Sequence, residues 1–571
     1  MSGSTDQAEI RPERCCDCRN EVGLSPGKRE VRALNAPVES TQSQSAPTEG
    51  YKNSPVSLGL QPSPAVTEGI GRVALGDLLR RSARRFRDKE AVVTPSGTIT
   101  FGELDDKANR CANMLLDKGA KPGDRIATIC ANSIDFIVVI FGIHKAGLVW
   151  VPINPVLSAD DRAYILGHTE TVIVITDADV GHAVPGGSNG APLVLTLGSS
   201  FDVGLSTASD VEPELPIHER DLTMIMYTSG TTSRPKGVMH CNLAVYATVM
   251  CNIGEWMVTR DDRILIVLPL FHVSAHCLLT TFLTAGATVV LHNGFEPGQV
   301  LTTIDQQKVS FFVGLPMMYA AMMEHPVRDT VDLASLRYCI YAMAPMPGPL
   351  LRRLLVEFCP TFVLSSGQTE MYPSTMMLRP EQQLLKEGNY WGEPSIVNDV
   401  AIMAEDGTLL PHGEVGEIVH RGPNVMLGYY KDEAATAESR RFGWHHTGDL
   451  GVIDDDGQLL FLDRLKDIIK SGGENVSSVK VEQVLLQCHL IANAAVIGVP
   501  HPRWQEAVVA VIMLKPGETA ESWHIHMYCR EMLAPHEVPK AFEFVDDLPL
   551  TATSKLRKVE LRNRFINLFG G

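Results

Sequence analysis

Residues 227–240 form a stretch of small, polar side chains that could hold an anion. The stretch is YTSGTTSRPKGVMH, in which five small or hydroxylated residues are followed closely by a lysine. Its backbone N–H groups and hydroxyls can donate hydrogen bonds, and Lys236 adds a positive charge. Gly237 and Val238 follow that lysine, whereas a Walker A loop has serine or threonine there. A phosphate-binding loop of another class is the functional interpretation, and a polar surface loop is the alternative.

The composition restricts the kinds of protein this chain can be. A hydrophobic content of 44% with 20% charged residues is typical of a globular protein. The net charge of −17 argues against a nucleic-acid partner, so an anionic substrate needs locally placed cations. Twelve cysteines without a repeated spacing favour a reducing compartment over a disulfide framework.

The sequence also lacks the usual membrane and export signals. Its longest apolar run, residues 136–143, is far shorter than the roughly 20 residues of a membrane span. The N-terminus has no apolar region of the kind found in signal peptides, and the C-terminus is not a peroxisomal tripeptide. We therefore expect a cytoplasmic protein with no transmembrane segment.

Alternating strands and helices are predicted to position the donor-rich loop. Helices are predicted near 104–116 and 134–145, and strands at 125–130, 148–153, 172–176, 222–227, 263–269, 288–291 and 311–314. This alternation predicts a parallel sheet with helices on both faces, in which ligands bind at the carboxyl ends of strands. The loop directly follows the strand predicted at 222–227, as that rule requires.

The two ends of the chain differ in character from its middle. Residues 1–68 are rich in Ser, Pro, Glu and Gln and are predicted to form a disordered extension. Past the turn at 454–457, a predicted helix at 481–487 and strands at 494–499 and 508–514 indicate a small α+β domain. We predict an α/β fold with a large domain of parallel or mixed sheets covered by helices (69–462), a hinge (463–466) and a small C-terminal domain (467–571).

Six motifs in one order resemble those of the adenylate-forming superfamily, which includes acyl-CoA synthetases, peptide-synthetase adenylation domains and beetle luciferase. They occupy residues 227–237, 365–370, 416–430, 444–450, 463–475 and 548–555. Six such motifs at sensible spacing are highly specific, and the similarity runs from about Leu75 to Arg564. The chain is thus identified as a member, similar to AMP-dependent acyl-CoA synthetases. It departs from the family pattern at Ser233, Ser366 and Ser554.

The resemblance implies a two-step reaction that uses ATP and magnesium. A carboxylate attacks the α-phosphate and expels pyrophosphate, and a thiol, usually that of CoA, then attacks the acyl-adenylate. The protein mainly neutralises charge and aligns the reactants. In the family the small domain is mobile and rotates between the two steps. A ligase that loads the phosphopantetheine of a carrier protein and a catalytically inactive relative are the alternatives.

The resemblance also implies roles for single residues. Lys555 would bridge the carboxylate and the α-phosphate, His272 would meet the carboxylate or gate the pocket, Thr369 would contact the α-phosphate, and Glu370 would hold magnesium. The predicted nucleotide and CoA positions are Thr228, Ser229, Gly230, Thr231, Thr232 and Lys236 around the phosphates; Ala342, Ala344 and Pro345 along adenine; Ser366, Gly367 and Gln368 in the motif before Thr369; Asp449 on the ribose; Arg464 beside the nucleotide; Lys466 at the hinge; and Gly472 and Gly473 at the thiol tunnel.

Each catalytic prediction has a purely structural alternative. Glu370 could be a solvated loop carboxylate, and Asp449 could be part of a Gly-Asp turn. Lys555 could be an exposed lysine in a basic stretch, and His272 could be an ordinary core histidine.

The sequence specifies the acid substrate less closely than it specifies the nucleotide chemistry. Relatives that activate amino acids carry aspartate at the position of His272, so an amino-acid substrate is disfavoured. The side chains predicted to surround the acid are largely apolar: Leu315, Met317, Met318, Tyr341, Met343 and Met371. We expect an apolar acid, fatty or aryl. At Ser366 the family has a tyrosine that stacks on adenine, so we predict weaker or differently arranged adenine binding, with Tyr372 or another residue to compensate.

Overall fold

The computed structural model describes residues 71–177, 192–228, 234–342, 346–550 and 556–570. The extension predicted at 1–68 lies outside these residues. Across the described ranges, no helix combines the length and apolar character needed to cross a membrane.

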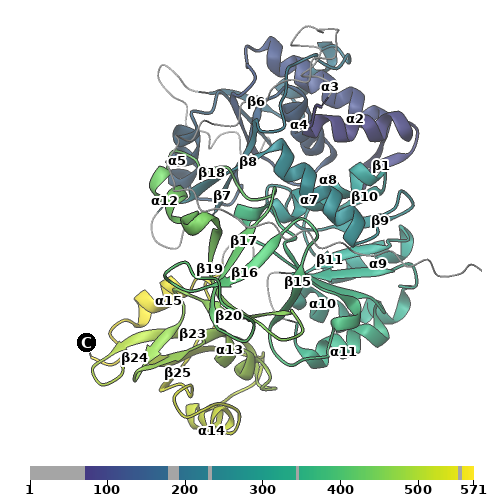
Figure 1. Cartoon of the computed structure of the whole chain (residues 1–571). Coiled ribbons are helices and arrows are strands. Elements are labelled where there is room, and N and C mark those ends of the chain that lie inside the picture. Colours follow the sequence, from purple (N-terminus) through teal and green to yellow (C-terminus); the bar gives the residue numbers. More distant parts are fainter. Residues whose placement is uncertain (1–70, 178–191, 229–233, 343–345, 551–555, 571) are drawn as a thin grey trace, which may run out of the picture. The chain divides into compact units, whose positions relative to one another are not determined.

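A seven-stranded sheet carries the donor-rich stretch, with its strands in the order β18-β8-β7-β4-β3-β5-β6 (Figure 1). Its strands are β3 (Arg125–Ile129), β4 (Val149–Pro152), β5 (Ile173–Thr176), β6 (Leu193–Thr196), β7 (Leu222–Thr228), β8 (Lys236–Cys241) and β18 (Gly428–Tyr429). Strands β3 to β7 pair in parallel, whereas β8 pairs antiparallel with β7 and with β18. Lys236 was predicted to lie in the phosphate-binding loop, but it lies in a strand. It begins β8 opposite Thr228, because the mostly buried residues that follow it pair along β7 as a strand.

A second sheet has thirteen strands and supplies most of the remaining motifs. Its strands are β1 (Glu90–Thr94), β2 (Gly97–Thr100), β9 (Arg263–Ile266), β10 (Thr288–Leu291), β11 (Phe311–Gly314), β12 (Tyr338–Tyr341), β13 (Phe362–Ser366), β14 (Met376–Leu378), β15 (Tyr390–Pro394), β16 (Asp399–Met403), β17 (Gly416–Arg421), β19 (His445–Ile453) and β20 (Leu459–Arg464). Strands β1, β10, β9, β11, β12 and β13 pair in parallel, and β14, β15, β16, β17, β19 and β20 are antiparallel. Of this antiparallel part, the turn at 454–457 between β19 and β20 was predicted, whereas most of the strands were not, because they lack long apolar runs.

Helices cover both faces of these sheets. Their bounds are α2 (Leu75–Arg85), α3 (Phe101–Asp117), α4 (Ile134–Lys145), α5 (Ala159–Thr169), α6 (Ser200–Thr207), α7 (Asn242–Glu255), α8 (Val273–Ala285), α9 (Pro297–Gln306), α10 (Pro316–Met323), α11 (Gly348–Glu357) and α12 (Glu433–Glu438). Helices α2, α3, α4, α7 and α8 share one hydrophobic core with strands of both sheets. Helix α4, confirmed at its predicted bounds, is apolar all round because nearly all of it is buried in that core.

The last hundred residues form the predicted small α+β domain. It contains β21 (Ile469–Ser471), β22 (Glu474–Val476), α13 (Ser478–Leu486), β23 (Ile491–His501), β24 (Gln505–Leu514), α14 (Ser522–Met532), β25 (Ala541–Phe544) and α15 (Lys558–Phe565). Its five-stranded sheet has a separate apolar core on each face. The chain thus has an α/β fold with a large domain of mixed sheets and a small α+β domain.

Candidate active site

Three predicted motifs lie where parallel strands end. Thr228 ends β7, Ala342 directly follows β12, and Ser366 ends β13. Carboxyl ends of strands are the usual ligand-binding edge of such sheets. Eight predicted site residues lie outside the described residues: Ser229, Gly230, Thr231, Thr232, Met343, Ala344, Pro345 and Lys555.

Lys236 and Glu370 meet through Tyr429, a residue with no predicted role. The Tyr429 hydroxyl donates to Glu370 Oε1 at 3.1 Å, and Lys236 Nζ lies 4.8 Å from the centre of the Tyr429 ring. Burial and the neighbouring Glu370 raise the pKa of Tyr429, so its hydroxyl stays protonated and remains a donor. Tyr429 is therefore placed to hold Glu370 and Lys236 at fixed positions. In the sequence, the only sign of a role for Tyr429 was its position in the motif at 416–430.

The backbone of the Thr369–Glu370 segment is held from two sides. His240 Nε2 donates to the Thr369 carbonyl at 2.7 Å, and the Met426 amide donates to the Glu370 carbonyl at 2.8 Å. Burial lowers the pKa of His240 to about 4, so the ring is neutral with its proton on Nε2. The sequence carried no sign of this role for His240, because its partner is 129 residues away.

A second group joins Gln368, Asp449 and Arg464. Asp449 is 4% exposed, and Gln368 Nε2 donates to its Oδ2 at 2.7 Å. Arg464 Nε lies 3.6 Å from Asp449 Oδ1, since the two residues are paired across β19 and β20. Glu417 accepts a hydrogen bond from the Gly448 amide at 2.9 Å and thereby fixes the turn before Asp449. Because Gln368, Thr369 and Glu370 are consecutive, the group around Asp449 is adjacent to the group formed by Lys236, Tyr429 and Glu370.

His272 caps the N-terminus of α8. Its side chain is half-buried, and its Nδ1 accepts a hydrogen bond from the Ser274 amide at 3.3 Å. Ser366 is half-buried, and the Gly367 that follows it is exposed.

The suggestion that Tyr372 compensates for Ser366 is wrong. Tyr372 is completely buried, and its hydroxyl lies 2.7 Å from His276 Nδ1 inside the core. The ring is packed among α7, α8 and β8 and is not open to a nucleotide.

Lys466, Gly472 and Gly473 are exposed residues after β20. The two glycines form the turn between β21 and β22 with φ values of 65° and 90°, which side chains with a Cβ rarely adopt. The Gly472 amide donates to the Trp504 carbonyl at 2.9 Å, so the turn is held within the small domain.

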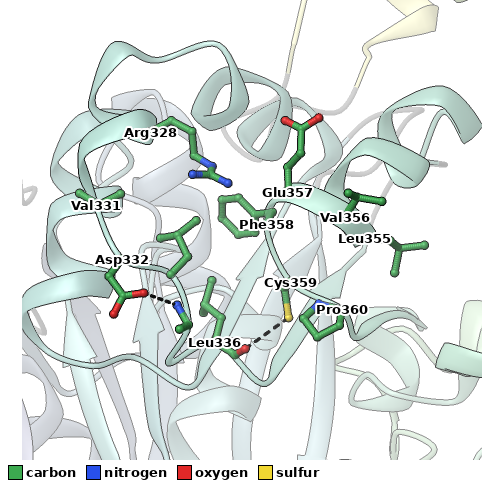
Figure 2. Close-up of a pocket in the computed structure, with 12 residues that line it drawn as sticks. Arg328, Val331, Asp332, Leu336, Leu355, Val356, Glu357, Phe358, Cys359 and Pro360 are labelled. Carbon is green, nitrogen blue, oxygen red and sulfur yellow. Dashed lines mark hydrogen bonds between the residues drawn. The ribbon is translucent and has the colours of Figure 1, made fainter.

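Figure 2 shows a pocket of about 390 Å³ that is separate from these groups. It is lined by Leu336, before β12, and by Pro360, before β13, at the amino ends of these strands. Ala342 and Ser366 follow the opposite, carboxyl ends. The pocket is therefore not the predicted nucleotide site.

Within the parts of the chain that the structure describes, no three His, Cys, Asp or Glu side chains form a metal-binding cluster. Magnesium bound to a nucleotide needs only one or two protein carboxylates. Glu370 fits that role, since its carboxylate has more acceptor positions than the single bond from Tyr429 occupies.

Two family models match most of the chain. The AMP-binding enzyme model matches residues 79–430, and the AMP-binding enzyme C-terminal domain model matches residues 480–555. This chain belongs to the AMP-binding enzyme family. The predicted resemblance is thereby confirmed.

Relatives that this AMP-binding enzyme matches over nearly their whole length include acid–CoA ligases. A feruloyl-CoA synthase of an Amycolatopsis species is 38% identical, over 86% of this chain and 99% of the relative. A long-chain-fatty-acid–CoA ligase of Mycobacterium tuberculosis is 33% identical, over 86% of this chain and 98% of the relative.

Solved structures of similar fold include an anthranilate CoA ligase in complex with anthranoyl-AMP, with a TM-score of 0.81 and 26% identity over 87% of this chain and 98% of that chain. ATP-bound MatB from Rhodopseudomonas palustris has a TM-score of 0.80 and 27% identity over 86% of this chain and 99% of that chain. The AMP-binding enzyme described here is accordingly an AMP-forming acid–CoA ligase, which forms an acyl-adenylate and then a thioester.

Proposed function

We propose that this enzyme uses ATP and Mg²⁺ to activate an apolar carboxylic acid, fatty or aryl, and transfers the acyl group to CoA. One observation carries the proposal. The consecutive residues Gln368, Thr369 and Glu370 join a group around Lys236 to a group around Asp449. The spacing suits a nucleotide whose phosphates lie at Lys236 and Glu370 and whose ribose lies at Asp449. The relatives' own acids, feruloyl, long-chain fatty and anthranoyl, favour the aryl and fatty classes.

In the first step a carboxylate oxygen attacks the α-phosphorus, and pyrophosphate leaves. Lys236 neutralises charge on the departing phosphates, Thr369 contacts the α-phosphate, and Lys555 aligns the carboxylate with it. Glu370 would hold the Mg²⁺, which when bound neutralises phosphate charge. His272, at the start of α8, orients the carboxylate.

In the second step the CoA thiol attacks the acyl carbon, and AMP leaves. We propose that the small domain rotates about Lys466, within the hinge at 463–466, so that the Gly472–Gly473 turn replaces Lys555 at the adenylate. A turn without side chains suits the close passage of a pantetheine arm. We likewise propose that an N-terminal extension spans residues 1–68, that the large domain spans 69–462 and that the small domain begins at 467.

We also propose a cytoplasmic location. All nine cysteines within the described residues are unpaired and buried, which suits a reducing compartment, and that compartment supplies ATP and CoA.

The function is tested by acid-dependent ATP–pyrophosphate exchange with fatty, aryl and dicarboxylic acids, followed by a thioester assay with free CoA. Exchange with an apolar acid and thioester formation with free CoA are expected. If the enzyme catalyses exchange but forms a thioester only with a phosphopantetheinylated carrier protein and not with free CoA, the acceptor is the carrier protein. The absence of exchange with every acid would identify an inactive relative and overturn the proposal.

Replacing Tyr429 with phenylalanine is expected to raise the Mg²⁺ concentration for half-maximal exchange about tenfold. The substitution removes the hydroxyl that holds Glu370 and keeps the ring beside Lys236. Loss of such an outer partner typically weakens metal binding about 10- to 100-fold. Magnesium titration of the exchange rate measures the effect. Tyr430→Phe is the matched control, because the ring of Tyr430 packs on His168 instead. An equal shift in both variants would contradict the role given to Tyr429.

A further inference from the structure

The strand pair that carries Asp449 is interrupted by a bulge. At this point Ile418 of β17 lies opposite three residues of β19, 447–449, and we call these three residues the Asp449 bulge. A bulge re-aims the side chains that it carries, and bulges are common beside active sites. Asp449, the last residue of the bulge, accepts a hydrogen bond from Gln368 at 2.7 Å and is the side chain proposed to bind the ribose.

The backbone of the bulge leaves the regular pairing between β17 and β19, so other groups hold it. The Gly448 amide donates to Glu417 Oε1 at 2.9 Å. The Gly448 carbonyl accepts from the amide of Leu465, within the proposed hinge, at 2.9 Å. Backbone polar groups withdrawn from water need such partners, because an unpaired group is destabilising. Glu417 is therefore a main support of the bulge on the side of β17.

His446 in turn holds Glu417. Its Nδ1 donates to Glu417 Oε2 at 2.7 Å, and its Nε2 donates to the Arg441 carbonyl at 3.0 Å. An ionised carboxylate and a carbonyl can only accept, so the ring donates from both nitrogens and carries a positive charge. The side chains of His446 and Glu417 are only 7% and 15% exposed. His446 thus fixes one oxygen of Glu417 by a charge-assisted bond while the other oxygen holds Gly448.

We propose that His446 is a positioning residue for the nucleotide, which acts through Glu417 to hold the Asp449 bulge where its carboxylate meets the ribose hydroxyls. This inference rests on the proposed function, which places the ribose at Asp449. Without the histidine, the Glu417 carboxylate loses its positive partner, turns toward water and releases the Gly448 amide. A displacement of about 1 Å in a positioned group is enough to cost about a hundredfold in rate.

The test measures how strongly the enzyme distinguishes ATP from 2′,3′-dideoxy-ATP, which lacks both ribose hydroxyls. Isothermal titration calorimetry gives the two Kd values with Mg²⁺ and without a carboxylic acid, so the readout does not depend on turnover. The unaltered enzyme is expected to bind ATP about a hundredfold more tightly, because the analogue leaves the Asp449 carboxylate without its two donors.

His446→Phe keeps a planar ring and removes both donors. The ratio of the two Kd values is expected to fall about tenfold, with the Kd of dideoxy-ATP unchanged, because only contacts to the ribose hydroxyls are misplaced. Equal weakening of both ligands, or an unchanged ratio in the folded variant, would overturn the inference and leave the proposed function intact. An unaltered enzyme that does not distinguish the two ligands would instead refute the ribose placement in the proposed function, and the inference with it.

Two further variants separate a positioning role from a general loss of structure. His446→Arg is expected to keep the ratio within about threefold of the parent value, because a guanidinium can donate to both acceptors. Glu417→Ala is expected to lower the ratio as His446→Phe does, and it provides the same readout if His446→Phe does not fold. The double variant should be no worse than Glu417→Ala, since His446 acts through Glu417, and additive losses would contradict that route.

His325→Phe is the matched control. His325 also lies beside a glutamate, Glu296, but the two side chains are 4.0 Å apart and more exposed. They lie at the starts of the helical turn Pro326–Thr330 and of α9, which carry no predicted site residue. The ratio of the two Kd values should stay at the parent value in this variant. A fall equal to that in His446→Phe would contradict the specific role of His446.

Discussion

Replacing Lys555 with alanine is expected to lower acyl-adenylate formation at least a hundredfold and to leave thioester formation from supplied acyl-adenylate within a few-fold. The lysine is proposed to align two anions, the carboxylate and the α-phosphate, that repel each other until a cation lies between them. Loss of one such electrostatic contact costs about 10²- to 10³-fold in rate. The second step has no such pair of anions, and the proposed rotation removes Lys555 from the site.

Pyrophosphate exchange measures the first step, and CoA-dependent consumption of synthetic acyl-adenylate measures the second. Arg557→Ala is the matched control, because Arg557 belongs to the same basic stretch and pairs with Glu560 on the surface. Its two rates should remain near those of the parent. Equal loss of both steps in Lys555→Ala would contradict the alternation of domains.

Asparagine at position 449 is expected to lower kcat/KM for ATP about a hundredfold and to weaken the second step as well. The ribose is present in ATP and in the acyl-adenylate, so both steps lose its contacts. A carboxylate can accept from both ribose hydroxyls, and each charge-assisted hydrogen bond contributes roughly 1.5–3 kcal/mol. The expected loss in both steps distinguishes Asp449 from Lys555.

The same two assays measure the Asp449→Asn effect. Asp262→Asn is the matched control, because Asp262 is also buried and accepts two hydrogen bonds at 2.7 Å from Arg337. That control should lower the unfolding temperature and leave the KM of ATP unchanged. An unaltered KM of ATP in Asp449→Asn would exclude the ribose role.

Elements built from local signals were predictable from the sequence. Helix α4 was predicted at its observed bounds because Ser133 caps a continuous apolar run that Lys145 ends. Strands β10 and β11 were predicted at their observed bounds because they are short and fully buried. Most of the antiparallel strands after β13 were missed because they lack the long apolar runs that mark buried strands, although the turn at 454–457 between β19 and β20 was predicted.

Tyr372 shows why side-chain placement was harder to predict. It follows a nucleotide motif, which suggested a residue facing the ligand. In the structure a left-handed backbone turns the ring into the core, where its partner His276 is 96 residues away in sequence. No pattern within a short window carries that information.

The sequence by itself determined the chemistry of this protein, because the order and spacing of six motifs specify an adenylate-forming enzyme. Only the tertiary structure decided which side chains support that chemistry. Tyr429 meets Glu370 across 59 residues, and His240 meets Thr369 across 129. Such pairs form only when segments distant in the sequence pack together, so no local pattern specifies them.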